Sequence, residues 1–177
     1  LTSLEVASLY NQGMPTNLLV NRNDYQSGNP TVFNTKQVDW DGVDDYLIAN
    51  STLGSFTGSV SLWVNRDTNT GYQFLTDFRA DSGAGFIYFL LNSNNLDKSS
   101  GTSYVDGITG ITVPTDGNWH QVVVTGIALN IKEYITFGIQ FGKSNDVLNG
   151  QMSQIGLWNT TLTANEVSSL YNHGLPI

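Results

Sequence analysis

Four tyrosine side chains are candidates for ligand chemistry in this sequence, because an aromatic ring offers an apolar face and its hydroxyl group a polar handle. Tyrosines near the ends of expected strands or in loops can present that face to a sugar ring; they are Tyr72, Tyr88, Tyr104 and Tyr134. The tryptophans stand inside expected strands, where they should fill the core or the space between sheets; they are Trp40, Trp63, Trp119 and Trp158. The four tyrosines are therefore the candidates for glycan stacking.

Residues for acid–base or nucleophilic catalysis are few and poorly spaced. Asp44 and Asp45 are adjacent, so on a strand their carboxylates point to opposite faces and do not act on one substrate. His120 and His173 lie far apart in the sequence, and His173 falls near an expected helix C-terminus, where positive charge is favoured. We expect a structural role for both histidines and predict no catalytic residue, so the protein is not expected to be an enzyme.

The charge of the chain excludes some classes of partner. Its 7 Lys and Arg residues against 15 Asp and Glu residues give a net charge of −8, and no basic cluster is present. Such a surface repels a phosphate backbone, so no nucleic-acid partner is expected. The longest wholly apolar run, Phe86 to Leu91, is much too short to span a bilayer, so no membrane insertion is expected. The absence of cysteine excludes disulfides and thiolate metal sites.

The two ends of the chain repeat one another. Residues 1–15 align with residues 162–176 at a constant offset of 161, and ten of the fifteen pairs are identical. Each copy begins with a Thr-x-x-Glu capping box and ends in Gly-x-Pro, which predicts short helices near residues 3–12 and 163–173. A repeat at domain length indicates tandem duplication. We therefore predict the closing helix of a preceding repeat at 1–15, a linker and first strand at 16–36, and the module itself at 37–177.

Between these two helices the apolar residues alternate with a period of two. Val60, Leu62 and Val64 share one face of an expected strand, while Ser61 and Trp63 share the other. Similar segments, separated by Asp-, Asn- and Gly-rich turns, predict strands near 37–40, 45–50, 60–64, 72–79, 85–91, 103–105, 108–113, 120–125, 135–141 and 151–158. Many short strands at this spacing predict an all-β fold, an antiparallel two-sheet jelly-roll sandwich.

Four segments resemble, in the right order, motifs of laminin-G-like domains in the concanavalin A-like lectin and glucanase superfamily. They are Val-Asp-Trp-Asp-Gly-Val-Asp-Asp-Tyr-Leu at 38–47, Phe-Thr-Gly-Ser-Val-Ser-Leu-Trp-Val at 56–64, Asn-Trp-His-Gln-Val-Val-Val-Thr at 118–125, and the closing strand and helix at 150–171. Ser153 replaces the family's Asp in the closing strand, and the hairpin that usually follows the Trp-His strand is missing. The resemblance implies the sandwich fold over 37–177. The Glu-x-Asp-x-x-Glu strand of the superfamily's glucanases is absent.

The closing segment 149–171 also resembles pentraxins, which are calcium-dependent relatives with the same sandwich. Two of their ion-binding loops match Asp81-Ser82, ahead of an apolar strand, and Ser144-Asn145-Asp146, ahead of the closing strand. Calcium binds six to eight oxygen atoms, which Asp, Asn and backbone carbonyls on loops supply. The resemblance thus implies calcium as a cofactor with Asp81, Asn145 and Asp146 as metal ligands. The alternative is that these residues form turns without an ion.

Two function classes remain open, and a glycoside hydrolase is the least favoured third. The first is a non-catalytic binding or adhesion module that presents its rim loops to a glycan or surface polysaccharide, used in tandem for avidity. The second is a structural module of a virion fibre or decoration, whose partners are neighbouring repeats and virion or surface proteins. Either function suits a phage or bacterial surface protein. The expected location is therefore extracellular, on a cell surface or on a virion.

Overall fold

The computed structural model describes residues 37–50, 53–79, 85–90, 92–131, 134–141 and 146–171. The chain divides into two units, Leu1–Val32 and Phe33–Ile177, and every described residue belongs to the second unit. The helix predicted near residues 3–12 and the assignments made for residues 1–36 lie outside the described residues. They stay predictions.

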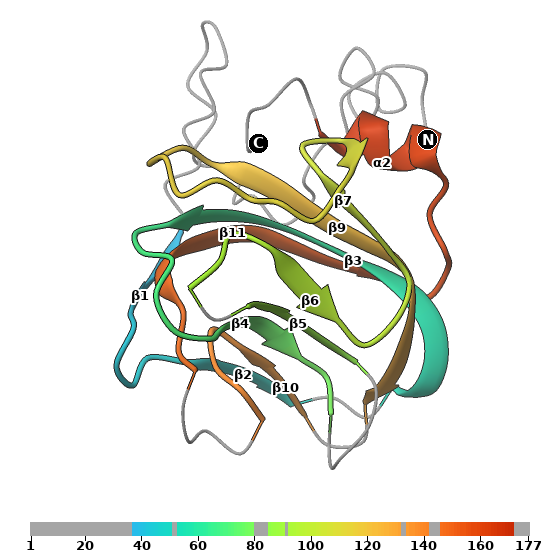
Figure 1. Ribbon diagram of the computed structural model, residues 1–177. Helices are drawn as coiled ribbons and strands as arrows, with labels where there is room; N and C mark the ends of the chain where they lie inside the picture. Colours follow the sequence, from blue (N-terminus) through green and yellow to red (C-terminus); the bar gives the residue numbers. More distant parts are fainter. Residues whose placement is uncertain are drawn as a thin grey trace, which may run out of the picture. The chain divides into compact units, whose positions relative to one another are not determined.

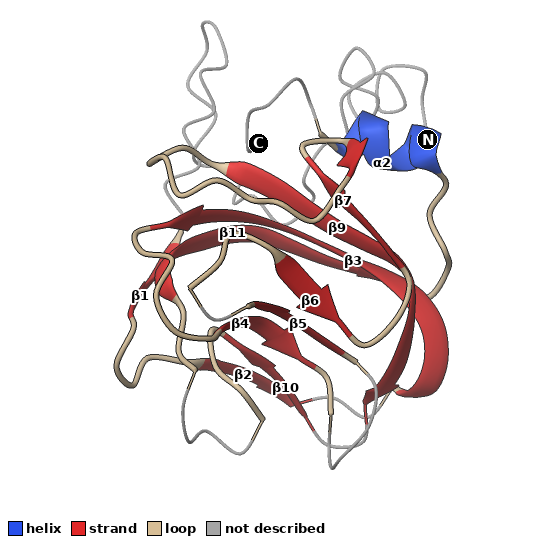
Figure 2. Ribbon diagram, in the orientation of Figure 1, coloured by secondary structure: helices blue, strands red, loops and turns tan. Residues whose placement is uncertain are grey.

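Two antiparallel sheets face one another across the second unit (Figures 1 and 2). The six-stranded sheet has the order β1 (Val38–Asp41), β11 (Asn149–Trp158), β3 (Gly54–Arg66), β9 (His120–Ile131), β7 (Thr102–Val105) and β8 (Ile108–Thr109). The five-stranded sheet has the order β2 (Leu47–Asn50), β10 (Tyr134–Phe137), β4 (Gln73–Asp77), β5 (Phe86–Phe89) and β6 (Leu96–Lys98). The short helix α2 (Ala164–Leu170) follows β11. The predicted all-β, antiparallel, two-sheet architecture with a short C-terminal helix is confirmed.

The core between the sheets follows from the alternation of apolar residues in the long strands. Val60, Leu62 and Val64 of β3 belong to the buried core cluster, as the period of two predicts. Val122 and Val124 of β9 join the same cluster from the neighbouring strand. Burial of one such side chain is worth roughly 1.5–3 kcal/mol, so the cluster is the main source of stability.

The closing helix covers the outer face of the six-stranded sheet. Its capping box is formed as predicted, with the Thr163 hydroxyl accepting from the Glu166 backbone N–H. Val167 is 0% exposed, and the ring of Tyr171 stacks on Trp63 with 5.9 Å between ring centroids. This contact explains why Trp63, on the face turned away from the core, is only 2% exposed. Trp40 is also buried, whereas Trp119 and Trp158 are half-buried.

The strands differ from the sequence-based expectations in length and in number. β4, β8 and β10 are shorter than the segments predicted at 72–79, 108–113 and 135–141. β3 and β9 run for 13 and 12 residues, because a bulge between Gly58 and Ser59 lets their pairing continue past the expected end. β6 was not predicted, because its Leu-Asp-Lys sequence contains a single apolar residue and carries no alternation. It forms by pairing with the apolar strand β5.

His120 lies between two carboxylates and joins β9 to two turns. Its Nδ1 is 2.7 Å from Oδ2 of Asp106, and its Nε2 is 3.1 Å from Oδ1 of Asp116. The other Asp106 oxygen accepts from the backbone N–H of Gln121 at 2.9 Å. These contacts give His120 the structural position that was expected for it, beside the turn of the β7–β8 hairpin.

We predict that protonation of His120 stabilises the fold. Burial lowers the pKa of His120, but hydrogen bonds and charges from Asp106 and Asp116 outweigh burial and raise this pKa above its ordinary value. A group with a raised folded-state pKa contributes its full stabilisation below the unfolded-state pKa of about 6.5, and this stabilisation is lost as pH rises through the folded-state value. The free energy of unfolding, measured by urea titration, should therefore fall as pH rises from about 6.5 through the folded-state pKa of His120.

The matched control is His120→Asn, which keeps a hydrogen-bonding side chain but does not titrate. His173 remains in both proteins, so the difference between their pH profiles isolates His120. Identical slopes in the two proteins would show that the carboxylates do not hold the imidazolium form.

Candidate functional site

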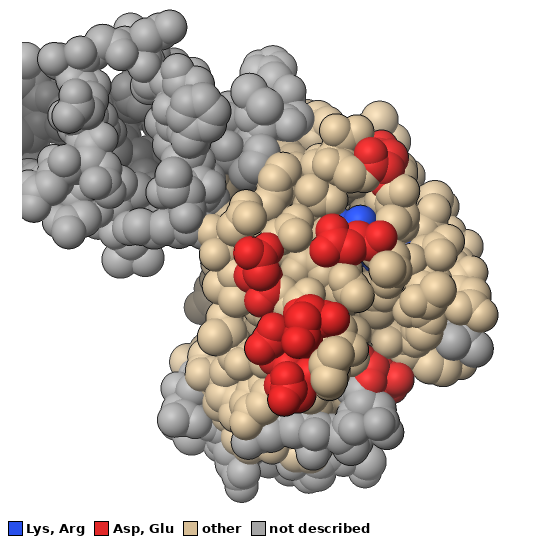
Figure 3. All heavy atoms as spheres, turned by 90° about the vertical axis from the view of Figure 1, so that its left-hand side faces the viewer, with Lys and Arg blue, Asp and Glu red and all other residues tan. Residues whose placement is uncertain are grey.

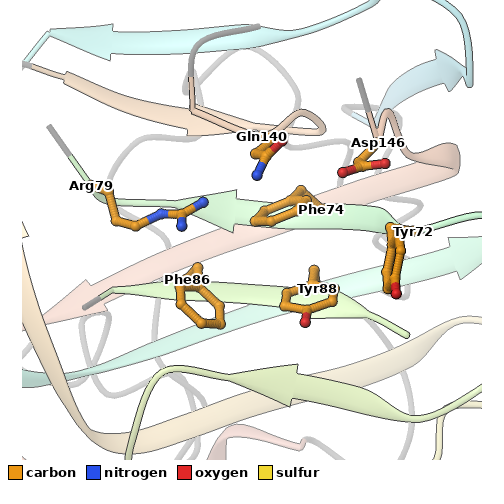
Figure 4. A pocket seen from close by; sticks show the side chains of 7 residues that line it. All are labelled: Tyr72, Phe74, Arg79, Phe86, Tyr88, Gln140 and Asp146. Carbon is orange, nitrogen blue, oxygen red and sulfur yellow. The ribbon is translucent and has the colours of Figure 1, made fainter. Parts of the chain in front are cut away.

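An open hollow of about 250 Å³ lies on the outward face of the five-stranded sheet (Figure 4). Its lining residues are Tyr72, Phe74, Arg79, Phe86, Tyr88, Gln140 and Asp146. Alternation along β5 explains the orientation: Ile87 and Phe89 belong to the core, so Phe86 and Tyr88 point away from it. The segment between β10 and β11 supplies the last two lining residues.

Aromatic rings from two neighbouring strands form the base of the hollow. Phe74 of β4 pairs directly with Tyr88 of β5, and their rings stack with centroids 4.8 Å apart. Phe86 lies 5.6 Å from Tyr88 between centroids, and Tyr72 meets the Tyr88 ring edge-on at 5.8 Å. Phe74 is only 4% exposed, whereas Tyr72 is 43% exposed. The rings of Phe74, Phe86 and Tyr88 thus form the base of the hollow, and the exposed ring of Tyr72 forms an accessible wall at one side.

Arg79 occupies one end of the hollow and is neutralised by a buried carboxylate. Asp77 is 0% exposed, and its carboxylate accepts from the Arg79 guanidinium and from the backbone N–H groups of Arg79 and Phe141, both at 3.0 Å. The hydrogen bond to Asp77 raises the pKa of Arg79. The guanidinium carbon lies 4.9 Å from the centroid of the Phe86 ring, which is cation–π distance.

Asp146 occupies the end of the hollow near Tyr72, opposite Arg79 (Figure 4). Its backbone carbonyl accepts from the Phe74 N–H at 3.0 Å, which holds the residue against β4. Its carboxylate makes no hydrogen bond or ion pair with another described residue, and burial raises the pKa of this carboxyl. The Asp146 carboxylate is therefore available to accept from a ligand.

The structure brings together two of the four predicted tyrosines. Tyr72 and Tyr88 line the hollow, and the Tyr88 hydroxyl donates to Asp97 at 2.8 Å; burial, with this bond, raises the pKa of Tyr88 to about 12. Tyr104 lies on β7 in the other sheet. Tyr134 stacks on Phe141, with centroids 5.4 Å apart, outside the set of lining residues.

Sequence reasoning missed four lining residues: Phe74, Arg79, Phe86 and Gln140. A signal for Phe86 was present, because β5 reads Phe-Ile-Tyr-Phe without a charged or amide residue. A strand that is apolar on both faces packs on two sides or presents an apolar outer face. No comparable local signal marked Arg79 or Gln140.

The three predicted metal ligands are only partly within the described region. Asp146 lies in the hollow, while Asp81 and Asn145 fall outside the described residues. Calcium coordination by this set stays a prediction.

Outside the hollow, a cluster of three carboxylates is formed by Asp41, Asp44 and Asp45. Their side-chain oxygens lie within 4.8 Å of one another. The expectation that Asp44 and Asp45 point apart on a strand was wrong, because residues 42–46 form a loop between β1 and β2. The loop closes through local bonds: Val43 N–H donates to Asp41 and Asp41 N–H donates to Asp45. Figure 3 shows the acidic face on the β1 side of the molecule. The spacing could hold a metal ion, but the local bonds account for the clustering without one.

Comparisons with known proteins add no relative. No family model matches the chain, and a search of curated proteins found no matching sequence. Within the described residues, no helix is both long and apolar enough to cross a membrane.

Proposed function

We propose that this protein is a non-catalytic glycan-binding module and that the aromatic hollow is its binding site. The observation that carries the proposal is the grouping of stacked rings with a free carboxylate and an amide, Asp146 and Gln140, in one open hollow. Aromatic faces pack on the C–H faces of sugars, while carboxylates and amides bond their hydroxyl groups. A volume of about 250 Å³ lies below the roughly 300–1,000 Å³ of drug-sized pockets, which suits one ring of a longer glycan.

The acidic residues of the hollow support binding of a glycan rather than its hydrolysis. Glycoside hydrolases need two carboxyl groups, roughly 5–9.5 Å apart, on either side of the scissile bond. Asp146 is the one acidic residue among the lining residues, and the nearby Asp77 carboxylate is buried and saturated by Arg79 and backbone N–H groups. Among its described lining residues, the hollow therefore holds one carboxylate and no acid–base pair of carboxyl groups.

We propose in addition that the strands are connected as a jelly roll and that the chain is built from repeated modules. The repeat of residues 1–15 at 162–176 favours a chain in which each module ends in a helix like α2, and residues 1–15 close a preceding module. Such an array places several weak sites on one chain and gains avidity. It suits an extracellular, cell-surface or virion protein. The same repeat favours the second candidate, a structural module of a virion fibre or decoration that binds its neighbours.

The two candidates are separated by a glycan array probed with and without calcium. A binding module should retain at least one glycan class, and Tyr88→Ala should weaken that binding at least about tenfold, which is 1.4 kcal/mol. Tyr104→Ala is the matched control, because it removes a half-buried tyrosine from the other sheet. An array that stays silent under both conditions would favour the structural module.

Calcium, held by the pentraxin-like loops, is proposed as the alternative occupant of the Asp146 carboxylate, and it has a direct test. An ion that binds only the native state raises the melting temperature. Millimolar calcium should therefore raise the melting temperature of the wild-type protein but not that of Asp146→Ala. Asp67→Ala is the control, since Asp67 is exposed in the turn after β3 and belongs neither to the lining of the hollow nor to the Asp41 cluster. An unchanged wild-type melting temperature would remove the cofactor.

A further inference from the structure

The hollow carries two charged side chains, and only one of them is compensated. Arg79 forms an ion pair with Asp77, so this end of the hollow has no net charge. Asp146 has no such partner among the described residues, and no ion pair joins it to Arg79. Among the described residues, the hollow therefore presents one carboxylate that has no ion-pair partner, beside apolar rings.

The rings near Asp146 also attract positive charge. An aromatic face carries a negative quadrupole and binds cations within about 6 Å of its centroid. Figure 4 places Asp146 and the exposed Tyr72 at the same end of the hollow, with Phe74 beside them. The Arg79 guanidinium already lies within cation–π distance of the Phe86 and Phe74 rings, at 4.9 and 5.7 Å from their centroids, whereas Tyr72 has no cation over it among the described residues. The Asp146 end combines two features that favour a cation.

Three kinds of ligand can be compared at this end. A neutral sugar would use the rings and leave the carboxylate to bond hydroxyl groups. An acidic sugar would be repelled by Asp146 and by the net charge of −8. Calcium would need six to eight oxygen atoms, and aromatic faces supply none. An ammonium group would use both the carboxylate, through a charge-assisted hydrogen bond, and the ring faces.

We propose that the glycan bound in the hollow carries a free amino group, as in a glucosamine- or galactosamine-containing polysaccharide, and that its ammonium group binds Asp146 beside Tyr72. This inference rests on the proposed glycan-binding function and names its ligand class.

The test is a glycan array in buffer with EDTA that pairs each amino-sugar oligosaccharide with its N-acetylated form at equal length. Binding of the best pair is then measured by calorimetry. The free-amine form should bind at least about tenfold more tightly than the N-acetylated form. Asp146→Asn should remove this preference and leave binding of the N-acetylated form. Tyr88→Ala should weaken both forms. Thermal melts confirm that each variant is folded.

Asp44→Asn is the matched charge control, because it removes the same charge from the exposed β1–β2 loop. The preference for the amine should survive this change. Loss of the preference in Asp44→Asn as well as in Asp146→Asn would show general attraction of a cationic glycan to an acidic protein, and would overturn the inference. Equal binding of both forms would overturn it while leaving the glycan-binding function standing. Binding that returns only when calcium replaces EDTA would also overturn it, and silence under every condition would overturn both proposals.

Discussion

Gly138→Ala should destabilise the protein by about 2–5 kcal/mol. Gly138 has a φ of +79°, in the left-handed region, which costs a residue with a Cβ atom roughly 1–2 kcal/mol. The added Cβ would also overlap the indole ring of Trp40, which is buried in the core, and overpacking of this kind costs about 1–3 kcal/mol. The backbone has little freedom to move, because Gly138 N–H donates to Leu75 and its carbonyl accepts from Leu148. Urea unfolding measures the loss.

Gly117→Ala is the control for backbone strain alone. Its φ is +78°, and a Cβ atom at this position would meet nothing within 4 Å. It should therefore cost only the roughly 1–2 kcal/mol of the left-handed conformation. Equal losses at Gly117 and Gly138 would show that Trp40 moves aside freely and that the indole does not require glycine at this position.

Asp77→Ala should destabilise the protein by about 3 kcal/mol, the lower end of the range for breaking a buried ion pair. The change removes the acceptor for the Arg79 guanidinium and for the backbone N–H groups of Arg79 and Phe141. The lower end applies because the Arg79 side chain is 18% exposed and can still reach water. The same variant should weaken glycan binding, because Arg79 loses its fixed place over the Phe86 ring.

Asp97→Ala is the matched control for the loss of stability that is expected in Asp77→Ala. Asp97 lies on β6 of the same sheet, is half-buried, and accepts from the hydroxyl of the hollow residue Tyr88. Asp97 also accepts from the backbone N–H of Lys98. Loss of hydrogen bonds to this charged, half-buried carboxylate should cost about 1.5 kcal/mol, the lower end of the range for bonds to charged groups. A cost at Asp77 no larger than at Asp97 would show that Arg79 does not depend on its buried carboxylate.

Features that depend on neighbours in the sequence were predictable. The capping box of Thr163 and Glu166 joins residues three positions apart, so it forms wherever the helix forms. The alternation of Val60 and Leu62 with Ser61 is a property of any extended strand. Tyr72 and Tyr88 were selected because they stand near expected strand ends, and both line the hollow.

Features that depend on the path of the chain between strands, or on how strands pair, were not predictable. Asp41 comes close to Asp44 and Asp45 because a loop, rather than a strand, follows β1. β6 has no apolar pattern of its own and exists through its pairing with β5. Sequence patterns report the faces of single elements, whereas such contacts require the path of the chain between elements.

The sequence by itself determined the type of element along most of the chain, the two-sheet class and the closing helix, because period-two alternation, turn residues and caps act over a few residues. Tertiary structure alone decided the candidate site. The register that sets Phe74 opposite Tyr88, and the fold that brings Gln140 and Asp146 to β4, join segments that share no local pattern. Non-local pairing is specified by the burial of the whole core rather than by any one segment, so the hollow could be located only in the folded chain.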